Sequence, residues 1–401
     1  MNKRSSHRNR SRPGILLMTP VIMLILLSLS VSGQPERAMN RSKHTQHKLF
    51  KSNLVLGGNV YFGFIANHHV GMEIYNSHFP SLEISLIKAT YGKKFWEQLY
   101  GYPWIGLTYW YSNLGTSPYL GSVHALLPHI NFELYSTRKV NFGLRIAAGL
   151  GYLTKTFDRI INYKHLAIGT HLNFAGNIMF DIRYKANPRL YLTGGISLTH
   201  FSNGSFKLPN YGINIPAIHA GAAYQLNKPN RYIERRLYDP TKPFDFDMHH
   251  VFEIDFIGII GYKNLDAIFG KKFLVYSLYG NIRKQISYKS RLGVGWDISY
   301  DGSDYKMLEK KQIIIDNKFS LIKTGVSASY GLAMGRLSFD FNYGFYIYLN
   351  DVDKADGAFY HKVGLKYDIT EKLFANILLK THWGKADYIG WGIGYRIKLV
   401  Y

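Results

Sequence analysis

The chain has 401 residues, no cysteine and a formal net charge of +23 at pH 7. The lack of cysteine excludes a disulfide framework, thiol chemistry and cysteine-ligated zinc. Such a positive charge is typical of a protein that binds nucleic acid or an anionic membrane surface. It can also serve only to keep loops soluble. The export signal described next argues against nucleic acid as a partner and leaves the other two readings open.

The N-terminus has the three parts of a secretory signal peptide. An apolar run over 14–33 ends in small residues, and the chain turns polar directly after it. The run is preceded by five basic residues, which are Lys3, Arg4, Arg8, Arg10 and Arg12. This pattern predicts a signal peptide over 1–33, cut near Gly33, and an N-terminal tail over 34–54. The alternative is a membrane anchor, because about 20 apolar residues can span a bilayer.

From residue 55 onward apolar and polar residues alternate with period two, as in RLGVGWDISY at 291–300. Aromatic residues make up 15% of the chain and include 32 tyrosines, which suit the aromatic girdles of a membrane barrel. The sequence therefore predicts an all-β transmembrane antiparallel β-barrel. The predicted strands are 57–66, 80–90, 103–112, 119–136, 140–152, 168–185, 189–203, 213–226, 251–262, 272–287, 290–301, 321–334, 336–350, 359–370, 372–383 and 386–400.

The connections between these strands alternate between short and long. Outer-membrane barrels have short periplasmic turns and long external loops, so strand 189–203 is expected to run outward. Residues 227–250 are rich in charge and proline and do not alternate. We expect them to form a periplasmic linker, or a plug segment, between the site-bearing strands of 55–226 and the further strands of 251–401.

Two barrel architectures fit this pattern. LYLTGGISLTHFSNG at 190–204 resembles LFANILLKTHWGKAD at 373–387, which suggests that the second half is a diverged copy of the first. The chain could therefore form two eight-stranded units. We favour one barrel of 14–16 strands, because the predicted inward faces carry many charges that a narrow interior would pair with difficulty. His382, the counterpart of His200, falls on an inward face and is expected to be structural.

The chain closes on an alternating strand and an aromatic residue, Tyr401. This ending resembles the C-terminal assembly signal of bacterial outer-membrane proteins. The resemblance implies that the barrel-assembly machinery recognises the last strand and that the protein resides in the outer membrane.

A serine, a histidine and an asparagine gather near the outer end of strand 189–203. His200 and Ser202 share its lipid-facing side with several leucines, and neighbours at i and i+2 lie roughly 7 Å apart at Cα, which lets Nε2 reach Oγ. Asn214, near the start of the next strand, could accept a hydrogen bond from the His200 ring. This is a nucleophile, a base and an orienting group. Asn203 and Gly204 could donate to an oxyanion.

A lone His-x-Ser on a strand is common and usually structural. Here the polar residues face lipid, where unsatisfied polar groups are costly, and such positions usually have a function. By contrast, the paired histidines at 67–69 and 248–250 are expected in loops or interfaces rather than in a metal site. No phosphate-binding Gly-rich loop precedes a helix, so nucleotide chemistry has no support.

HFSNGSFKLPNYGIN at 200–214 resembles the outer-membrane lipid A 3-O-deacylases, which are acyloxyacyl hydrolase-like enzymes, with a likeness over about residues 50–226. The resemblance implies a serine esterase that removes an ester-linked acyl chain from lipid A, or lipopolysaccharide, without a metal or other cofactor. It makes Ser202 the nucleophile and His200 the base. It also implies a set of oxyanion-supporting, substrate-contacting and loop-shaping residues: Asn203, Gly204, Lys207, Pro209, Asn210 and Gly212. Lys207 could hold a lipid A phosphate.

The sequence departs from this family at Asn214, where the deacylases have a glutamate. The departure puts the rate in question, because an amide stabilises an imidazolium less than a carboxylate does. A Ser-His-Asn set is also similar to that of outer-membrane phospholipase A, which uses calcium, although KLPNYGIN at 207–214 favours the deacylase and no acidic calcium cluster is evident. A barrel without catalysis, serving as a channel or scaffold, is the third interpretation.

Overall fold

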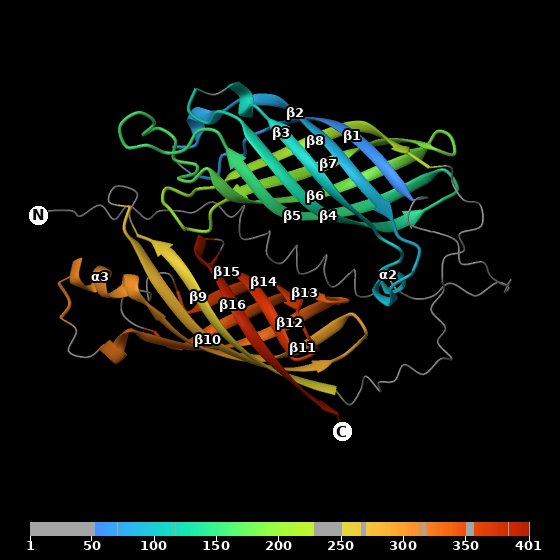
Figure 1. The fold of residues 1–401 in the computed structure, drawn as a ribbon. Coiled ribbons are helices and arrows are strands. Elements are labelled where there is room, and N and C mark those ends of the chain that lie inside the picture. The colour runs from blue at the N-terminus through green and yellow to red at the C-terminus, as the bar shows by residue number, and fades with distance from the viewer. Residues whose placement is uncertain are drawn as a thin grey trace, which may run out of the picture.

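The computed structural model describes residues 53–69, 71–116, 118–227, 251–265, 270–310, 312–314, 318–349, 357–383 and 385–400. The predicted signal peptide, tail and linker, the histidines at 248–250 and Tyr401 lie outside these residues, apart from 53–54 and 227 at the edges. Within them the chain forms two closed eight-stranded antiparallel barrels that lie side by side (Figure 1). The all-β barrel prediction is confirmed. The preferred single barrel of 14–16 strands is wrong, and the alternative of two units is correct.

A strand lies at each predicted place. The first barrel contains β1 Leu54–Phe64, β2 His78–Ala89, β3 Trp104–Ser112, β4 Val123–Ser136, β5 Val140–Leu153, β6 Leu172–Lys185, β7 Leu190–Ser202 and β8 Ile213–Gln225. The second contains β9 Val251–Asn264, β10 Lys272–Gln285, β11 Ser290–Asp301, β12 Ile322–Met334, β13 Leu337–Tyr348, β14 Phe359–Asp368, β15 Leu373–His382 and β16 Lys385–Val400. Within each barrel, every strand pairs with the next in sequence, and β1 closes on β8 as β9 closes on β16.

The few helical segments lie in the connections. They are η1 Glu73–Tyr75, α2 Phe95–Leu99, η2 Leu114–Thr116, α3 Gly302–Lys310 and η4 Lys318–Leu321. Among the described residues, no helix has the length and apolarity needed to cross a membrane.

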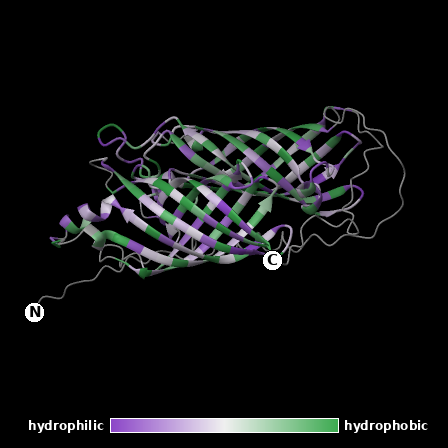
Figure 2. Ribbon diagram, turned by 60° about the horizontal axis from the view of Figure 1, so that its bottom comes forward, coloured by the Kyte–Doolittle hydropathy of each residue, from purple (hydrophilic) through white to green (hydrophobic). Residues whose placement is uncertain are grey.

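Alternation along each strand separates a lipid face from a lumen face. On β11, Val294 is 63% exposed, whereas Asp297, three residues further along and on the opposite face, is 1% exposed. Figure 2 shows the resulting bands of hydrophobic and hydrophilic residues across both barrels. The period-two pattern forms barrel strands because the outward side chains meet hydrocarbon while the inward ones pack against one another.

The lumen of the second barrel explains why the single-barrel prediction failed. Its charges do not lie unpaired in a narrow interior, but form one network. Arg283 contacts Asp255 at 2.6 Å and Asp340 at 3.1 Å, and Lys366 bridges the same two carboxylates at 3.0 and 2.5 Å. Buried charges are tolerated when they are paired and hydrogen-bonded. The charged inward faces are therefore compatible with eight strands, because opposite charges from different strands converge.

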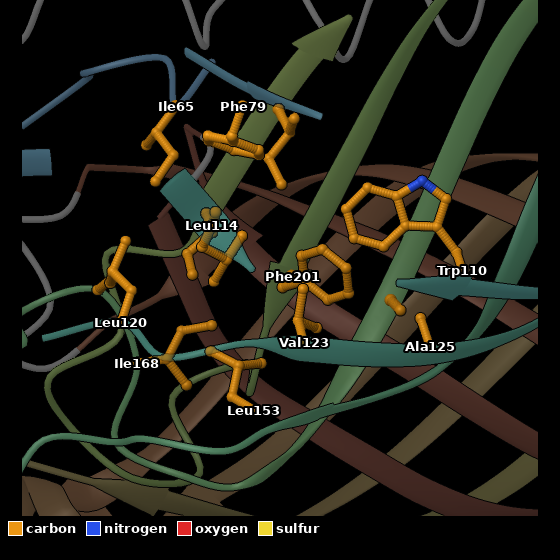
Figure 3. Packing of buried hydrophobic residues seen from close by; sticks show 14 of the residues in the cluster. Ile65, Phe79, Trp110, Leu114, Leu120, Val123, Ala125, Leu153, Ile168 and Phe201 are labelled. Atoms are coloured by element: carbon orange, nitrogen blue, oxygen red, sulfur yellow. The ribbon is translucent and has the colours of Figure 1, made fainter. Parts of the chain in front are cut away.

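The mouth of the first barrel at the end of its long connections is filled by an apolar core to which residues of those connections contribute. Leu114 and Leu120 come from the β3–β4 connection and Ile168 from the β5–β6 connection, and they pack with Leu153 and Phe201 from strands β5 and β7 (Figure 3). All five side chains are fully buried. The loops around the end of β7 are thus held by packing.

The two barrels contact each other through α2, at the end of the first barrel where the β4–β5 and β6–β7 turns are short. Tyr100, which follows α2, packs with Tyr330 and Leu332 of β12, and its hydroxyl donates to Ala333 O at 3.0 Å. A second contact, at the opposite end of the barrels, involves the β7–β8 loop.

Candidate active site

Strand β7 brings His200 and Ser202 to its outward face. Phe201, between them, points into the lumen, where it is fully buried beside Trp110 with ring centroids 5.7 Å apart (Figure 3). Because side chains alternate along a strand, burial of Phe201 turns both polar neighbours outward, where each is partly exposed. The inward position of His382 also agrees with prediction, since it is buried and its Nε2 lies 2.9 Å from the Tyr346 hydroxyl.

Asn214 of β8 lies directly opposite His200 in the β7–β8 register. Its Oδ1 lies 2.6 Å from His200 Nδ1. A carboxamide oxygen only accepts, so this contact requires the hydrogen on Nδ1 and leaves Nε2 with a free lone pair. This is the tautomer that a general base needs.

Gly212 lets the chain pass close to this pair. It has φ +81°, and a Cβ there would lie 3.1 Å from His200 Cε1. A side chain at this position would strain the backbone and press on the imidazole, so glycine suits the site on both counts.

His68, from the β1–β2 connection, lies behind Asn214. Its Nδ1 lies 3.3 Å from Asn214 Nδ2, and its Nε2 lies 2.7 Å from Tyr211 O. With the hydrogen on Nε2, His68 donates to Tyr211 O and accepts from the Asn214 amide. Its Nδ1 also lies 3.0 Å from Ala66 O, a contact that becomes a hydrogen bond only when Nδ1 is protonated. Sequence reasoning placed 67–69 in a loop and gave no sign of this contact.

Ser202 Oγ is held by the loop that follows it. Gly204 N donates to Oγ at 3.1 Å, and Asn210 Nδ2 donates to it at 3.0 Å. Among the described residues these contacts, together with Asn210 Oδ1 at 3.3 Å, are the hydrogen bonds of Ser202 Oγ, and none goes to His200. A serine hydroxyl moves between staggered positions, so Oγ can turn toward the imidazole and leave both donors facing the space it vacates.

Asn203 differs from the prediction that it supports an oxyanion. Its side chain is 4% exposed and points into the loop, where Nδ2 donates to Thr170 Oγ1 at 3.1 Å and Lys207 O at 2.8 Å. Its backbone N–H donates a hydrogen bond to Asn210 Oδ1 at 3.0 Å. Asn203 therefore shapes the loop, whereas Asn210, which the sequence analysis placed among the oxyanion-supporting, substrate-contacting and loop-shaping residues, reaches the serine.

Lys207 lies on the same loop, near the external β5–β6 connection. The backbone N–H groups of Ile161 and Ile160, with a smaller contribution from the Lys207 charge, hold the pKa of Asp158 below its ordinary value. Lys207 thus lies close to the β5–β6 connection of the first barrel. Within the described part of the chain, no group of three or more His, Asp or Glu residues could hold a metal ion.

Both barrels match models of one enzyme family. Residues 83–223 match the model described as lipid A 3-O-deacylase (PagL), and residues 252–399 match the model described as acyloxyacyl hydrolase, C-terminal domain. No curated protein matches the chain.

Two of the similar solved structures are outer-membrane proteins. Neisserial surface protein A is 9% identical, with a TM-score of 0.32, over 43% of this chain and 97% of its own. The outer membrane enzyme PagL is 15% identical, with a TM-score of 0.27, over 41% of this chain and 97% of its own.

Proposed function

Since the chain belongs to the lipid A 3-O-deacylase family of the bacterial outer membrane through residues 83–223 and 252–399, we propose that it hydrolyses an acyl ester of lipid A with Ser202, His200 and Asn214. The observation that carries this proposal is the 2.6 Å contact between His200 Nδ1 and Asn214 Oδ1, beside a serine on the lipid-facing side of β7.

The first half of the reaction acylates the serine. Ser202 Oγ turns toward His200, gives its proton to Nε2 and attacks the ester carbonyl carbon, so that an Oγ–C bond forms. The carbonyl oxygen becomes an oxyanion that accepts hydrogen bonds from Asn210 Nδ2 and Gly204 N. Collapse of the tetrahedral intermediate breaks the bond to the sugar oxygen, which takes the proton from His200.

The second half releases the fatty acid. His200 Nε2 removes a proton from water, which attacks the acyl carbon, and the returning electron pair expels Ser202 Oγ. The serine regains its proton from His200. Asn214 holds the imidazole throughout, but its neutral amide stabilises the imidazolium less than a carboxylate would. We therefore expect a slower enzyme than one with glutamate at this position.

The location of the site suits a substrate that stays in the membrane. Ester carbonyls of lipid A lie near the level where acyl chains meet head groups, and Ser202 lies at the outer end of β7, on the face that meets lipid. Lys207 on the adjacent loop could hold a lipid A phosphate by a charge-assisted contact. We further propose that the barrel-assembly machinery recognises strand β16 at the C-terminus.

Asn214 also supports a second candidate, an enzyme that cleaves phospholipids as outer-membrane phospholipase A does. Mass spectrometry of lipids from cells that produce the full chain or Ser202→Ala separates the candidates. Loss of one hydroxyacyl mass from lipid A only with the parent chain supports the deacylase. Calcium-dependent lysophospholipid release supports the phospholipase. Unchanged lipids with both proteins would overturn catalysis and leave a channel or scaffold.

A further inference from the structure

The loop that carries the Gly204 donor is hydrogen-bonded to the second barrel. Ser205 Oγ donates to Ala386 O at 2.7 Å, and Asn264 N donates to Ser205 O at 3.0 Å. Ala386 belongs to β16 and Asn264 ends β9. Two neighbouring strands of the second barrel therefore form hydrogen bonds with one residue of the β7–β8 loop.

Packing adds to these bonds on both sides of Ser205. Gly204 has φ +59°, and a Cβ there would overlap the side chain of Ile389, so its backbone lies against the wall of the second barrel. Phe206 packs edge-on against Tyr262, with ring centroids 6.1 Å apart, and the Lys272 ammonium lies 3.7 Å from the Phe206 ring centre. The loop is therefore fixed over three consecutive residues by strands β9, β10 and β16.

Ion pairs connect the ends of β9 and β16 that contact Ser205. Lys263, next to Asn264, contacts Asp387, next to Ala386, at 2.6 Å, and contacts Asp301 of β11 at 3.0 Å. Asp387 and Asp301 are almost fully buried. The charges at the outer mouth of the second barrel thus set the spacing of the two strands that hold Ser205.

We propose that the second barrel is a positioning element for the esterase site. Its β9 and β16 ends hold the β7–β8 loop so that the Gly204 N–H points at Ser202 Oγ, and the oxyanion site is incomplete without them. This inference rests on the proposed function, and it gives the second barrel a task that requires neither a channel nor a second active site.

Two matched pairs of variants in the full chain test the contact from the second barrel. Ile389→Ala removes the wall behind Gly204, whereas Ile393→Ala makes the same change on the same strand at a 67% exposed, lipid-facing position. Asn264→Pro removes the N–H that Ser205 O accepts, whereas Asn264→Ala keeps it. Each protein is compared in kcat and KM on vesicles containing lipid A, and in the rate at which a serine-reactive fluorophosphonate labels Ser202.

We expect Ile389→Ala and Asn264→Pro to lower kcat and the labelling rate about tenfold, with KM nearly constant, because misplacing an oxyanion donor acts mainly on the transition state. The two control variants should keep the parent rates. Folding of every variant is checked by the heat-dependent gel mobility of the barrel. Parent-like rates in folded Ile389→Ala and Asn264→Pro would overturn the positioning role while leaving the esterase intact. If Ser202→Ala matched the parent chain in both assays, the proposed esterase activity itself would be overturned.

Discussion

The side-chain amide of Asn214 lies between two imidazoles, with Oδ1 2.6 Å from His200 Nδ1 and Nδ2 3.3 Å from His68 Nδ1. A carboxamide, unlike a carboxylate, has two different ends, and only the oxygen can accept the His200 N–H. His68 favours the productive orientation because its Nδ1 accepts a hydrogen bond from the Asn214 amide nitrogen. His68 thereby acts on the base through Asn214, as a positioning residue.

Replacing His68 is therefore expected to slow the reaction without weakening substrate binding. We predict that His68→Phe lowers kcat about tenfold with little change in KM, since the flipped amide would hold His200 in the wrong tautomer for part of the time. Rescue by His68→Gln, whose side-chain oxygen can accept the amide, would separate orientation from mere packing. His69→Phe, which keeps a ring against Tyr211, serves as the control. Equal kcat for His68→Phe and the parent would contradict the role.

Asn214→Glu should raise the rate. A carboxylate at this position keeps the hydrogen bond to His200 Nδ1 and adds a negative charge that stabilises the imidazolium formed during attack. We predict an increase in kcat of roughly tenfold, measured as fatty acid release from lipid A vesicles. Asn214→Leu, which cannot accept a hydrogen bond, should lose most of the activity. A slower Asn214→Glu enzyme would mean that His68 and the loop around Tyr211 fit only the neutral amide.

Substitutions of Asn210 and of Asn203 are expected to have different effects, the first on the reaction rate and the second on the stability of the loop. Asn210 Nδ2 reaches Ser202 Oγ, so we predict that Asn210→Ala lowers kcat about 100-fold, the usual effect of losing one oxyanion donor. Asn203→Ala removes bonds to Thr170 and Lys207 that fix the loop, and should instead increase proteolysis of the β7–β8 loop. If Asn203→Ala instead lowered kcat and Asn210→Ala instead increased proteolysis, the oxyanion role would belong to Asn203.

The sequence predicted the strands and their faces well, because period-two alternation is a local pattern. It also predicted the pairing of His200 with Asn214, since one loop joins their two strands and alternation sets the face of each. It did not predict which strands close a barrel, because charges that pair across the second lumen, such as Arg396 with Asp255, lie on strands distant in the sequence. For the same reason it missed His68, which is 146 residues from Asn214, and Ile389 beside Gly204.

The ion network in the second lumen should be essential for folding of that barrel. Arg283 is almost fully buried among Glu253, Asp255 and Asp340. Removing it leaves buried carboxylates without their partner, and we predict that Arg283→Met lowers the free energy of unfolding by about 3 kcal/mol. Urea unfolding in detergent, followed by tryptophan fluorescence, measures the change. Lys398→Met on the exposed end of β16 should unfold with the parent, and an unshifted Arg283→Met would mean that Lys366 and Arg396 suffice.

The external β5–β6 connection should loosen in mild acid because of His165. Burial lowers the pKa of this imidazole from its ordinary value of 6.5 to about 4, so the folded loop binds fewer protons than the opened loop between these two pH values. The contribution of neutral His165 to the free energy of opening the loop is fully present above pH 6.5. It is lost as the pH falls toward 4, by up to about 3 kcal/mol. Hydrogen exchange of residues 154–171 at pH 7 and pH 5 measures the effect, and His165→Phe, which fills the same space beside Tyr75 without titrating, should abolish the difference. Loop exchange that remains equally pH-dependent in His165→Phe would assign the acid sensitivity to another group.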